Sequence, residues 1–270
     1  MRAHRIPDLL LGAYLVLFFA YLFAPLAVMG AATFNASRFP TVTPWQGTTL
    51  MWFEALWADR AMWRALGTSL VVAAGVVAVA LPAGTAAALV LTSLNARARG
   101  FAYALMVSPL LTPGVVIGIA TLILWRNLGV GGGVHLIILA QASFIVAYVM
   151  LMVVARLQRF DRTQEEAALG LGASRWLVFR RILLPFLRPA LLAAGFIAFL
   201  QSVENYNTTL FVRGFDTPLT VYIATRVRTG LTPAVNALGL VMIALTVVGA
   251  AAFEIARRTR ARRAAALTSP

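Results

Sequence analysis

The side chains that most often perform catalysis are nearly absent from this sequence. It contains no Cys and no Lys, and its two histidines are His4 and His135. A phosphate-binding Walker loop requires Lys, so the chain cannot supply that kind of ATP site. Without Cys there is no thiolate metal site, and two isolated histidines do not predict a histidine-based metal site. A Gly-x-Ser-x-Gly nucleophile motif is also missing, so we predict that the chain is not an enzyme and holds no metal or cofactor.

The most concentrated group of polar side chains lies inside an otherwise apolar segment, at 201–209. Polar residues within a membrane-spanning helix are costly unless they face a cavity or a neighbouring helix, so this run predicts part of a solute pathway. Its single carboxylate, Glu204, favours a cationic solute; the alternative is an ion pair between Glu204 and an arginine such as Arg213. The candidate pathway residues are Gln201, Glu204, Asn205, Asn207 and Thr208.

A second polar stretch, between the fourth and fifth apolar runs, has the pattern of two short helices separated by glycines. Thr163 followed by Glu166 matches a capping box at the start of the first helix. The positive end of that helix also favours Glu165 and Glu166. Gly170 and Gly172 are expected to end it.

Ser174 is placed to cap the second helix, which Pro185 is expected to end before Pro189 opens the next apolar segment. The expected loop therefore runs over 157–186 as helix, glycine hinge and helix. A short exposed helix with small residues on its surface suits insertion into a groove of another protein. The pattern by itself leaves two interpretations open, a docking site for a partner and a plain connecting loop.

The apolar runs around these stretches place the chain in a membrane. Apolar residues make up 61% of the 270 residues and charged residues only 12%, against about 25% charged in soluble domains. Because a membrane-spanning helix needs roughly 20 apolar residues, we predict an all-α polytopic membrane protein with six transmembrane helices. The expected spans are 9–33, 66–93, 101–125, 134–155, 189–212 and 234–256.

The distribution of arginines predicts the orientation of the spans. The chain has 23 basic and 9 acidic residues, a net charge of +14. The tail at 1–8, the turn at 97–99, the loop at 156–188 and the tail at 257–270 hold sixteen arginines, and the opposite side holds seven. By the positive-inside rule, the termini and the loop at 157–186 are cytoplasmic. The basic excess thus reflects membrane topology and contact with anionic lipid, not nucleic acid.

A tryptophan-rich segment separates the first two spans on the outer side. It holds four of the six tryptophans, Trp45, Trp52, Trp57 and Trp63. Their spacing predicts an amphipathic helix over 48–64 that lies at the level of the lipid headgroups. The helix serves as an aromatic anchor or as a docking point for an external partner, and the sequence leaves both open.

The series Glu166-Ala167-Ala168, Gly172 and then Ile182-Leu183-Leu184-Pro185 resembles the EAA loop of ABC importer permeases. This resemblance implies the type I ABC importer permease (MetI-like) fold and a coupling helix that rests in a cleft of a separate ATPase. ATP and Mg²⁺ would then be bound by the partner ATPase subunits. The residues that it implies for ATPase coupling are Glu165, Glu166, Ala167, Ala168, Gly170, Gly172, Ile182, Leu184 and Pro185.

Further stretches at 34–45, 217–223 and 233–238 resemble the second permease of spermidine/putrescine importers. The resemblance implies a polyamine or another small, cationic solute. Permeases for iron, thiamine or phosphonate compounds are the alternatives within the class, and a stand-alone secondary transporter or channel is the alternative outside it. The polyamine permeases commonly carry two adjacent acids where this chain has Glu204 followed by Asn205.

The same resemblance implies a set of partners. They are two copies of an ABC ATPase subunit, a second homologous permease in a heterodimer, an extracytoplasmic solute-binding protein and membrane lipid. The implied location is the bacterial cytoplasmic (inner) membrane, with several spans.

Overall fold

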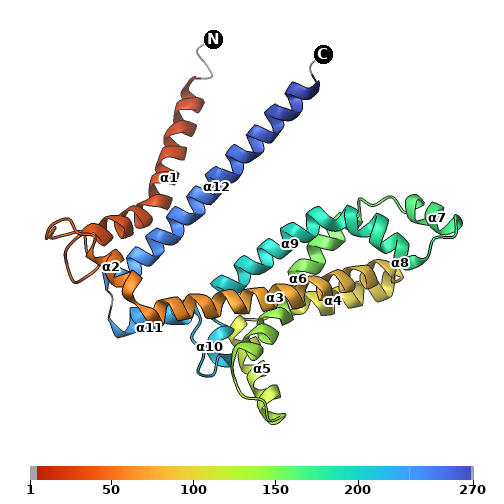
Figure 1. The fold of residues 1–270 in the computed structure, drawn as a ribbon, viewed down its shortest axis with the longest axis horizontal. Coiled ribbons are helices and arrows are strands. Elements are labelled where there is room, and N and C mark those ends of the chain that lie inside the picture. The colour runs from red at the N-terminus through yellow and green to blue at the C-terminus, as the bar shows by residue number, and fades with distance from the viewer. Residues whose placement is uncertain (1–4, 231, 269–270) are drawn as a thin grey trace. The chain divides into compact units, whose positions relative to one another are not determined.

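The computed structural model describes residues 5–230 and 232–268, and the regular elements in this part of the chain are helices (Figure 1). The expectations for His4 and for the arginines of the two tails fall on residues or side chains outside this description. The all-α prediction is confirmed. The helices are α1 (Arg5–Phe34), α2 (Met51–Ala58), α3 (Arg60–Ser93), α4 (Ala96–Leu111), α5 (Gly114–Asn127), α6 (Val134–Leu157), α7 (Thr163–Gly170), α8 (Arg175–Val178), the π-helical turn η1 (Phe179–Leu183), α9 (Leu184–Glu204), α10 (Thr209–Val212), α11 (Leu219–Thr229) and α12 (Pro233–Thr268).

Four of the described helices are long and apolar enough to cross a membrane, or five if the bent pair of α4 and α5 forms one span. They are α1, α3, α6 and the continuous helix Arg175–Glu204. The apolar part of α12, Pro233–Gly249, is a shorter helix. The chain divides into two compact units, Met1–Arg60 with Ile223–Pro270 and Ala61–Tyr222.

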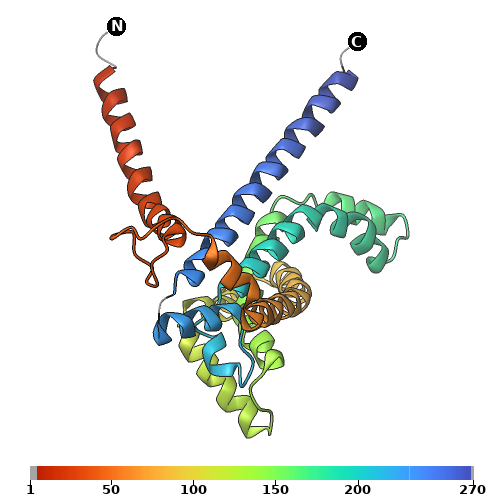
Figure 2. The same cartoon turned by 60° about the vertical axis from the view of Figure 1, so that its left-hand side comes forward.

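In the first unit, α12 packs against both α1 and α2. Figures 1 and 2 show α1 and α12 meeting close to α2 and separating toward their other ends. Most apolar side chains of α1 are exposed, including Tyr21 and Phe23. An apolar helix with so little protein around it is typical of a membrane span that faces lipid or another subunit.

The segment between α1 and α2 is organised by Asn35, which is fully buried. Its side-chain amide donates to the carbonyl oxygens of Thr41 and Pro44 at 2.9 and 3.1 Å. Its Oδ1 accepts a hydrogen bond from the N–H of Gln46 at 2.8 Å. Its carbonyl oxygen accepts one from the indole of Trp52 at 2.9 Å. The side-chain amide of Asn35 therefore satisfies the backbone of the loop, and its backbone carbonyl joins the loop to Trp52 of α2.

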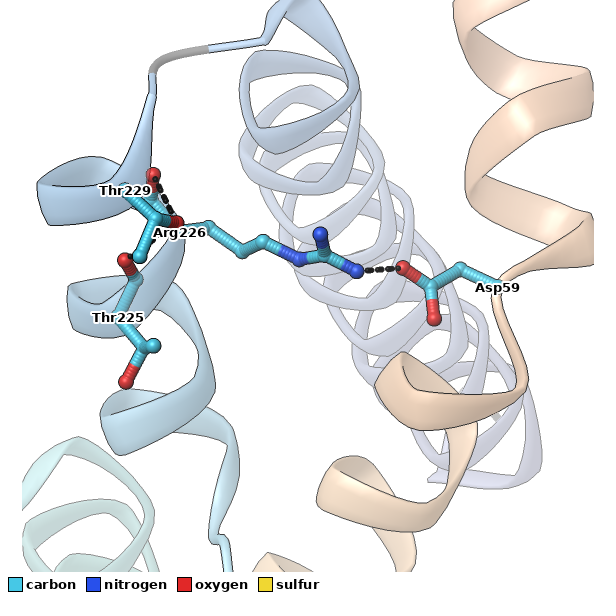
Figure 3. Close-up of polar contacts among 4 residues, drawn as sticks. All are labelled: Asp59, Thr225, Arg226 and Thr229. Atoms are coloured by element: carbon cyan, nitrogen blue, oxygen red, sulfur yellow. Dashed lines mark hydrogen bonds and ion pairs between the residues drawn. The ribbon is translucent and has the colours of Figure 1, made fainter.

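The helix expected over 48–64 is interrupted, which corrects that prediction. α2 ends at Ala58, and Asp59 is extended, with its N–H bonded to the carbonyl of Leu56. Asp59 forms an ion pair with Arg226 of α11 at 2.9 Å (Figure 3). The pair is partly exposed, so it adds only about 0–1 kcal/mol. An acidic residue that caps the preceding turn and meets an arginine is better placed outside a helix than inside it.

α6 is the central helix of the second unit, where it packs against α9, α4, α5 and α10. It buries a larger share of its apolar window than any other candidate span of the described chain. Leu136, Ile137, Ile145 and Met150 are fully buried on different faces. A helix that is apolar on all sides is stable in such a position because each face finds an apolar neighbour.

The span expected over 101–125 is a broken helix in the structure. α4 ends at Leu111, α5 begins at Gly114, and the two helices are bent by 101°. Pro113 has no N–H with which to continue the hydrogen bonds of α4, and Thr112 before it is extended. The sequence marks this break with a proline, but the size of the bend depends on how α5 packs.

Candidate functional site

The loop at 157–186 begins with α7, whose cap differs from the prediction. Asp161 accepts hydrogen bonds from the hydroxyl of Thr163 at 2.7 Å and from its N–H at 3.0 Å. Thr163 is therefore the first helical residue, and the expected capping box with Glu166 does not form. An aspartate two residues upstream makes a local turn that uses the threonine as a donor. These hydrogen bonds, the hydroxyl one first, hold the pKa of Asp161 below its ordinary value.

The C-terminal end of α7 depends on Gly172, as predicted. Gly172 has a φ of +85°, in the left-handed region that favours glycine. Its N–H bonds to the carbonyl of Leu169 at 3.0 Å, and the N–H of Ala173 bonds to that of Ala168 at 3.1 Å. This pair of hydrogen bonds is a Schellman motif. It turns the chain sharply after α7 without leaving those carbonyls unpaired.

The second helix begins where it was expected but does not end at Pro185. Ser174 caps α8 by accepting a hydrogen bond from the N–H of Leu177 at 3.3 Å, which confirms the predicted cap. The chain then continues through η1 and α9 as one helix, so Pro185 and Pro189 lie inside it, which corrects the predicted boundary. The π-helical turn directly precedes Pro185, and in it the N–H of Leu184 bonds to the carbonyl of Phe179, five residues back.

The tip of this loop carries large apolar side chains that the chain itself does not cover. Leu171, directly after α7, is 90% exposed, and Trp176 of α8 is 68% exposed. Trp176 stacks on Phe179 with the ring centroids 5.5 Å apart, so the indole is held in place. Exposed apolar groups of this kind are typical of a surface that meets another protein or a membrane.

The loop residues that the sequence singled out fall into two groups. Those on α7 and its C-terminal turn are Glu165, Glu166, Ala167, Ala168, Gly170 and Gly172. The others are Ile182 at the end of η1, and Leu184 and Pro185 at the start of α9. The first group is mostly exposed. In the second group Ile182 is half-buried and Leu184 and Pro185 are exposed, while Leu183 between them packs against the core.

The polar run at 201–209 coincides with a second break, between α9 and α10. α9 ends at Glu204, and Asn205 is extended. The side chain of Asn205 accepts hydrogen bonds from the N–H and the hydroxyl of Thr209, at 3.3 and 3.1 Å. The polar residues therefore satisfy the backbone where the helix is interrupted, as a break within a membrane requires.

A buried glutamine of α6 bridges this break. The amide of Gln141 donates to the hydroxyl of Thr209 at 2.8 Å, and its Oε1 accepts from the hydroxyl of Ser202 at 2.5 Å. Gln141 is 1% exposed, so these contacts lie in the protein interior. One side chain thus joins the end of α9 to the start of α10. Sequence reasoning missed Gln141, although a lone amide in an apolar span is itself a signal.

The structure separates the five predicted pathway residues by exposure. Glu204 and Asn207 are exposed, and Gln201 and Asn205 are half-buried. Thr208 is fully buried, and its hydroxyl has no partner in the described part of the chain. It packs on α5, where a Cβ at Gly118 would lie 2.7 Å from the carbonyl oxygen of Thr208.

The alternative ion pair between Glu204 and Arg213 is not present. Arg213 instead donates to the carbonyl of Asp216 at 3.0 Å and to the hydroxyl of Thr217 at 3.3 Å. Within the described residues Glu204 has no ion-pair partner. The local turn after α10 provides acceptors closer to Arg213. No group of three metal-ligating side chains occurs in the part of the chain that the structure describes.

Comparisons with known proteins agree with this architecture. The chain is 35% identical to the putrescine transport system permease protein PotI of Escherichia coli (strain K12) over 269 residues, covering 96% of this chain and 92% of the relative. It is 30% identical to the spermidine/putrescine transport system permease protein PotC of the same organism over 257 residues, covering 94% and 96%.

The fold matches a solved structure as well. That structure is a bacterial ABC transporter involved in the import of the acidic polysaccharide alginate, with a TM-score of 0.70 and 14% sequence identity, covering 96% of this chain and 98% of the other. Residues 80–263 match the family model described as binding-protein-dependent transport system inner membrane component. The chain therefore belongs to this family, the membrane-spanning permeases of ABC importers, and is not an enzyme.

Proposed function

We propose that this chain forms one half of the membrane pathway of an ATP-driven importer for putrescine or a related polyamine. The observation that carries the proposal is the exposed, unpaired carboxylate of Glu204 at the break after α9, in a chain whose relatives are putrescine and spermidine/putrescine permeases. A carboxylate with the amide of Asn207 nearby in the chain offers acceptors for an ammonium group. The C-terminal end of α9 adds partial negative charge at the same place.

The other half of the pathway is a second homologous permease in a heterodimer, and two copies of an ABC ATPase subunit bind ATP and Mg²⁺. An extracytoplasmic binding protein delivers the solute. The family is defined by dependence on such a binding protein. The termini and the loop lie on the cytoplasmic side, which the arginine distribution supports.

The loop at 157–186 is the part that meets the ATPase. α7 rests in a cleft of that subunit and transmits its closure to the spans. The ordered, uncovered side chains of Leu171 and Trp176 support this role, since they flank the glycine turn that presents α7. The coupling residues are those of α7 together with Ile182, Leu184 and Pro185.

The experiment is uptake by proteoliposomes that contain the complete complex. We expect ATP-dependent accumulation of labelled putrescine in the presence of the binding protein. Replacing Glu204 by Gln removes the charge but keeps the shape, and should raise the KM for putrescine about tenfold because one charge-assisted contact is lost. Glu204→Asp should retain most of the affinity.

Glu54→Gln on α2 is the matched control, because it removes an exposed carboxylate of the same kind far from the polar run in sequence. Thiamine, ferric iron and a phosphonate are offered as competing solutes to separate the polyamine proposal from the alternatives within the class. Competition by one of these and not by spermidine would refute the polyamine assignment. Uptake without ATP would refute the coupling to an ATPase.

A further inference from the structure

The two ends of the loop at 157–186, called the coupling loop from here on, meet at one aromatic ring. Arg156 lies in the last turn of α6, where the loop leaves the bundle, and Phe186 lies in the first turn of α9, where it returns. The Nε–H of Arg156 donates to the carbonyl oxygen of Phe186 at 3.2 Å. The guanidinium carbon of Arg156 also lies 4.1 Å from the centroid of the Phe186 ring. A cation over an aromatic face at this distance is attracted by the ring quadrupole.

Phe160 contacts the same ring from the loop side. Its ring centroid is 5.0 Å from that of Phe186, with the planes tilted by 56°. Phe160 lies immediately before Asp161, whose carboxylate accepts hydrogen bonds from Thr163, the first residue of α7. The ring of Phe186 thus contacts the end of α6 and the entry to α7 together, and all three side chains are half-buried.

Within the described residues, no other loop arginine lies over an aromatic ring, although Arg162 donates a hydrogen bond to the carbonyl oxygen of Thr92 at 3.3 Å. Arg159, Arg175, Arg180 and Arg181 are exposed, and their side chains have no hydrogen-bond, ion-pair or ring partner within the described residues. They account for the positive charge of the cytoplasmic side. Arg156 differs because its charge lies over the ring of Phe186 while its Nε–H bonds to the backbone carbonyl of that same residue.

We propose that Arg156, Phe160 and Phe186 form a clamp that closes the base of the coupling loop, so that α7 and α9 move together. This inference rests on the proposed coupling role of the loop. α9 runs without interruption from Phe186 to Glu204, about 27 Å at 1.5 Å per residue. A displacement of α7 by the ATPase would therefore reach the break in the solute pathway. Without the clamp, the loop would bend at its base and the displacement would be lost there.

The first test measures uptake and ATP hydrolysis in the same proteoliposomes. Arg156→Gln keeps hydrogen-bond donors but removes the charge, and Phe186→Leu keeps an apolar side chain but removes the ring. Each should lower the solute taken up per ATP by about tenfold, while hydrolysis stays within about twofold of the parent complex. Arg156→Lys keeps the charge and Phe186→Tyr keeps the ring, so both should retain most of the uptake per ATP.

Arg159→Gln is the matched control, since it removes the same charge from an exposed neighbour without side-chain contacts. It should leave uptake per ATP unchanged. An unchanged ratio in Arg156→Gln and Phe186→Leu would overturn the clamp. The clamp would also be overturned if Arg156→Lys and Phe186→Tyr lowered uptake per ATP as much as Arg156→Gln and Phe186→Leu do. Such a result would indicate that any change at these positions impairs transport.

A second test does not depend on transport. The chain contains no Cys, so spin labels can be attached at cysteines placed at Gln164 on α7 and Leu192 on α9, both exposed. In the complex, the label-to-label distance distribution should be narrow, and Arg156→Gln or Phe186→Leu should broaden it, but Arg159→Gln should not. Unchanged widths would overturn the clamp. If the parent complex shows no ATP-driven uptake, the proposed function fails while the distance widths still decide the clamp.

Discussion

At the scale of single residues, two buried amides hold irregular backbone in place. Asn35 organises the loop before α2, and Gln141 joins the two sides of the break after Glu204. In both places the chain leaves helical geometry, and its polar groups need partners that regular hydrogen bonds no longer supply. A single amide offers both donors and an acceptor, which makes it suited to this task.

We predict that Gln141→Leu destabilises the protein. The substitution leaves the buried hydroxyl of Ser202 without its partner, which costs about 1–3 kcal/mol, while the hydroxyl of Thr209 keeps its hydrogen bond to Asn205. Thermal unfolding of the purified complex should therefore begin at a lower temperature. Ser143→Ala, on the same helix, removes a hydroxyl that bonds only to the carbonyl of Ala140 and should change little. Equal stability of Gln141→Leu and the parent would show that the network is dispensable.

At the scale of elements, the glycines of α7 have different tasks although they are two residues apart. Gly170 is the last helical residue, and Gly172 takes the left-handed conformation that closes the Schellman motif. Neither position has a heavy atom within 4 Å of a built Cβ. Any difference between alanine substitutions there must come from the backbone and not from crowding.

We predict that Gly172→Ala loosens the end of α7 and that Gly170→Ala does not. A left-handed conformation costs a residue with a Cβ about 1–2 kcal/mol, whereas Ala in the last helical turn is about 1 kcal/mol more favourable than Gly. Hydrogen exchange of the amides at 169–173 in the complex measures this, and should be faster in Gly172→Ala only. Equal exchange in both variants would contradict the motif.

The two broken helices of the second unit form one feature. Gly114 and Gly118 of α5 face Thr208, which lies at the break between α9 and α10. The bend before α5 and the polar run therefore meet, although they are far apart in sequence. Helices that are interrupted inside a membrane commonly lie at a solute path, because the freed backbone groups need a cavity or a neighbour.

At the scale of the whole molecule, exposed apolar surface and arginine distribution describe a protein that acts within a complex and a membrane. α1 leaves most of its apolar side chains uncovered. Sixteen of the 23 arginines lie in the tails and loops that the sequence predicts to be cytoplasmic. Uncovered apolar surface of this kind is typical of a helix that faces lipid or another subunit, and the positive-inside rule predicts the side on which the arginines lie.

We predict that the loop after α1 lies outside the membrane and α7 on the cytoplasmic side. Single cysteines introduced into this cysteine-free chain can be labelled to test this orientation. Phe39→Cys, in the exposed loop after α1, should react with an impermeant maleimide added to spheroplasts. Gln164→Cys on α7 should react only after the membrane is permeabilised. Labelling of Gln164→Cys from outside would contradict the placement of the coupling loop on the cytoplasmic side.

Sequence reasoning was most successful where structure depends on near neighbours. The apolar runs, the turn at Gly172 and the cap at Ser174 follow from hydrophobicity and local backbone preference. The capping box at Thr163 was wrong because Asp161 competes for the same hydroxyl. The end assigned to Pro185 was wrong because a π-helical turn lets the helix continue through it.

What no local pattern contains is the pairing of distant side chains. Gln141 meets Ser202 and Thr209, 61 and 68 positions away, and Arg156 meets Phe186, 30 positions away. Composition and spacing identified a membrane protein with a helix–glycine–helix loop and a polar run, since hydrophobicity and turn preference act over a few residues, and the EAA assignment of that loop came from its resemblance to a family. The packing of α6 against α9 brings the remaining partners together, because burial depends on which helices become neighbours.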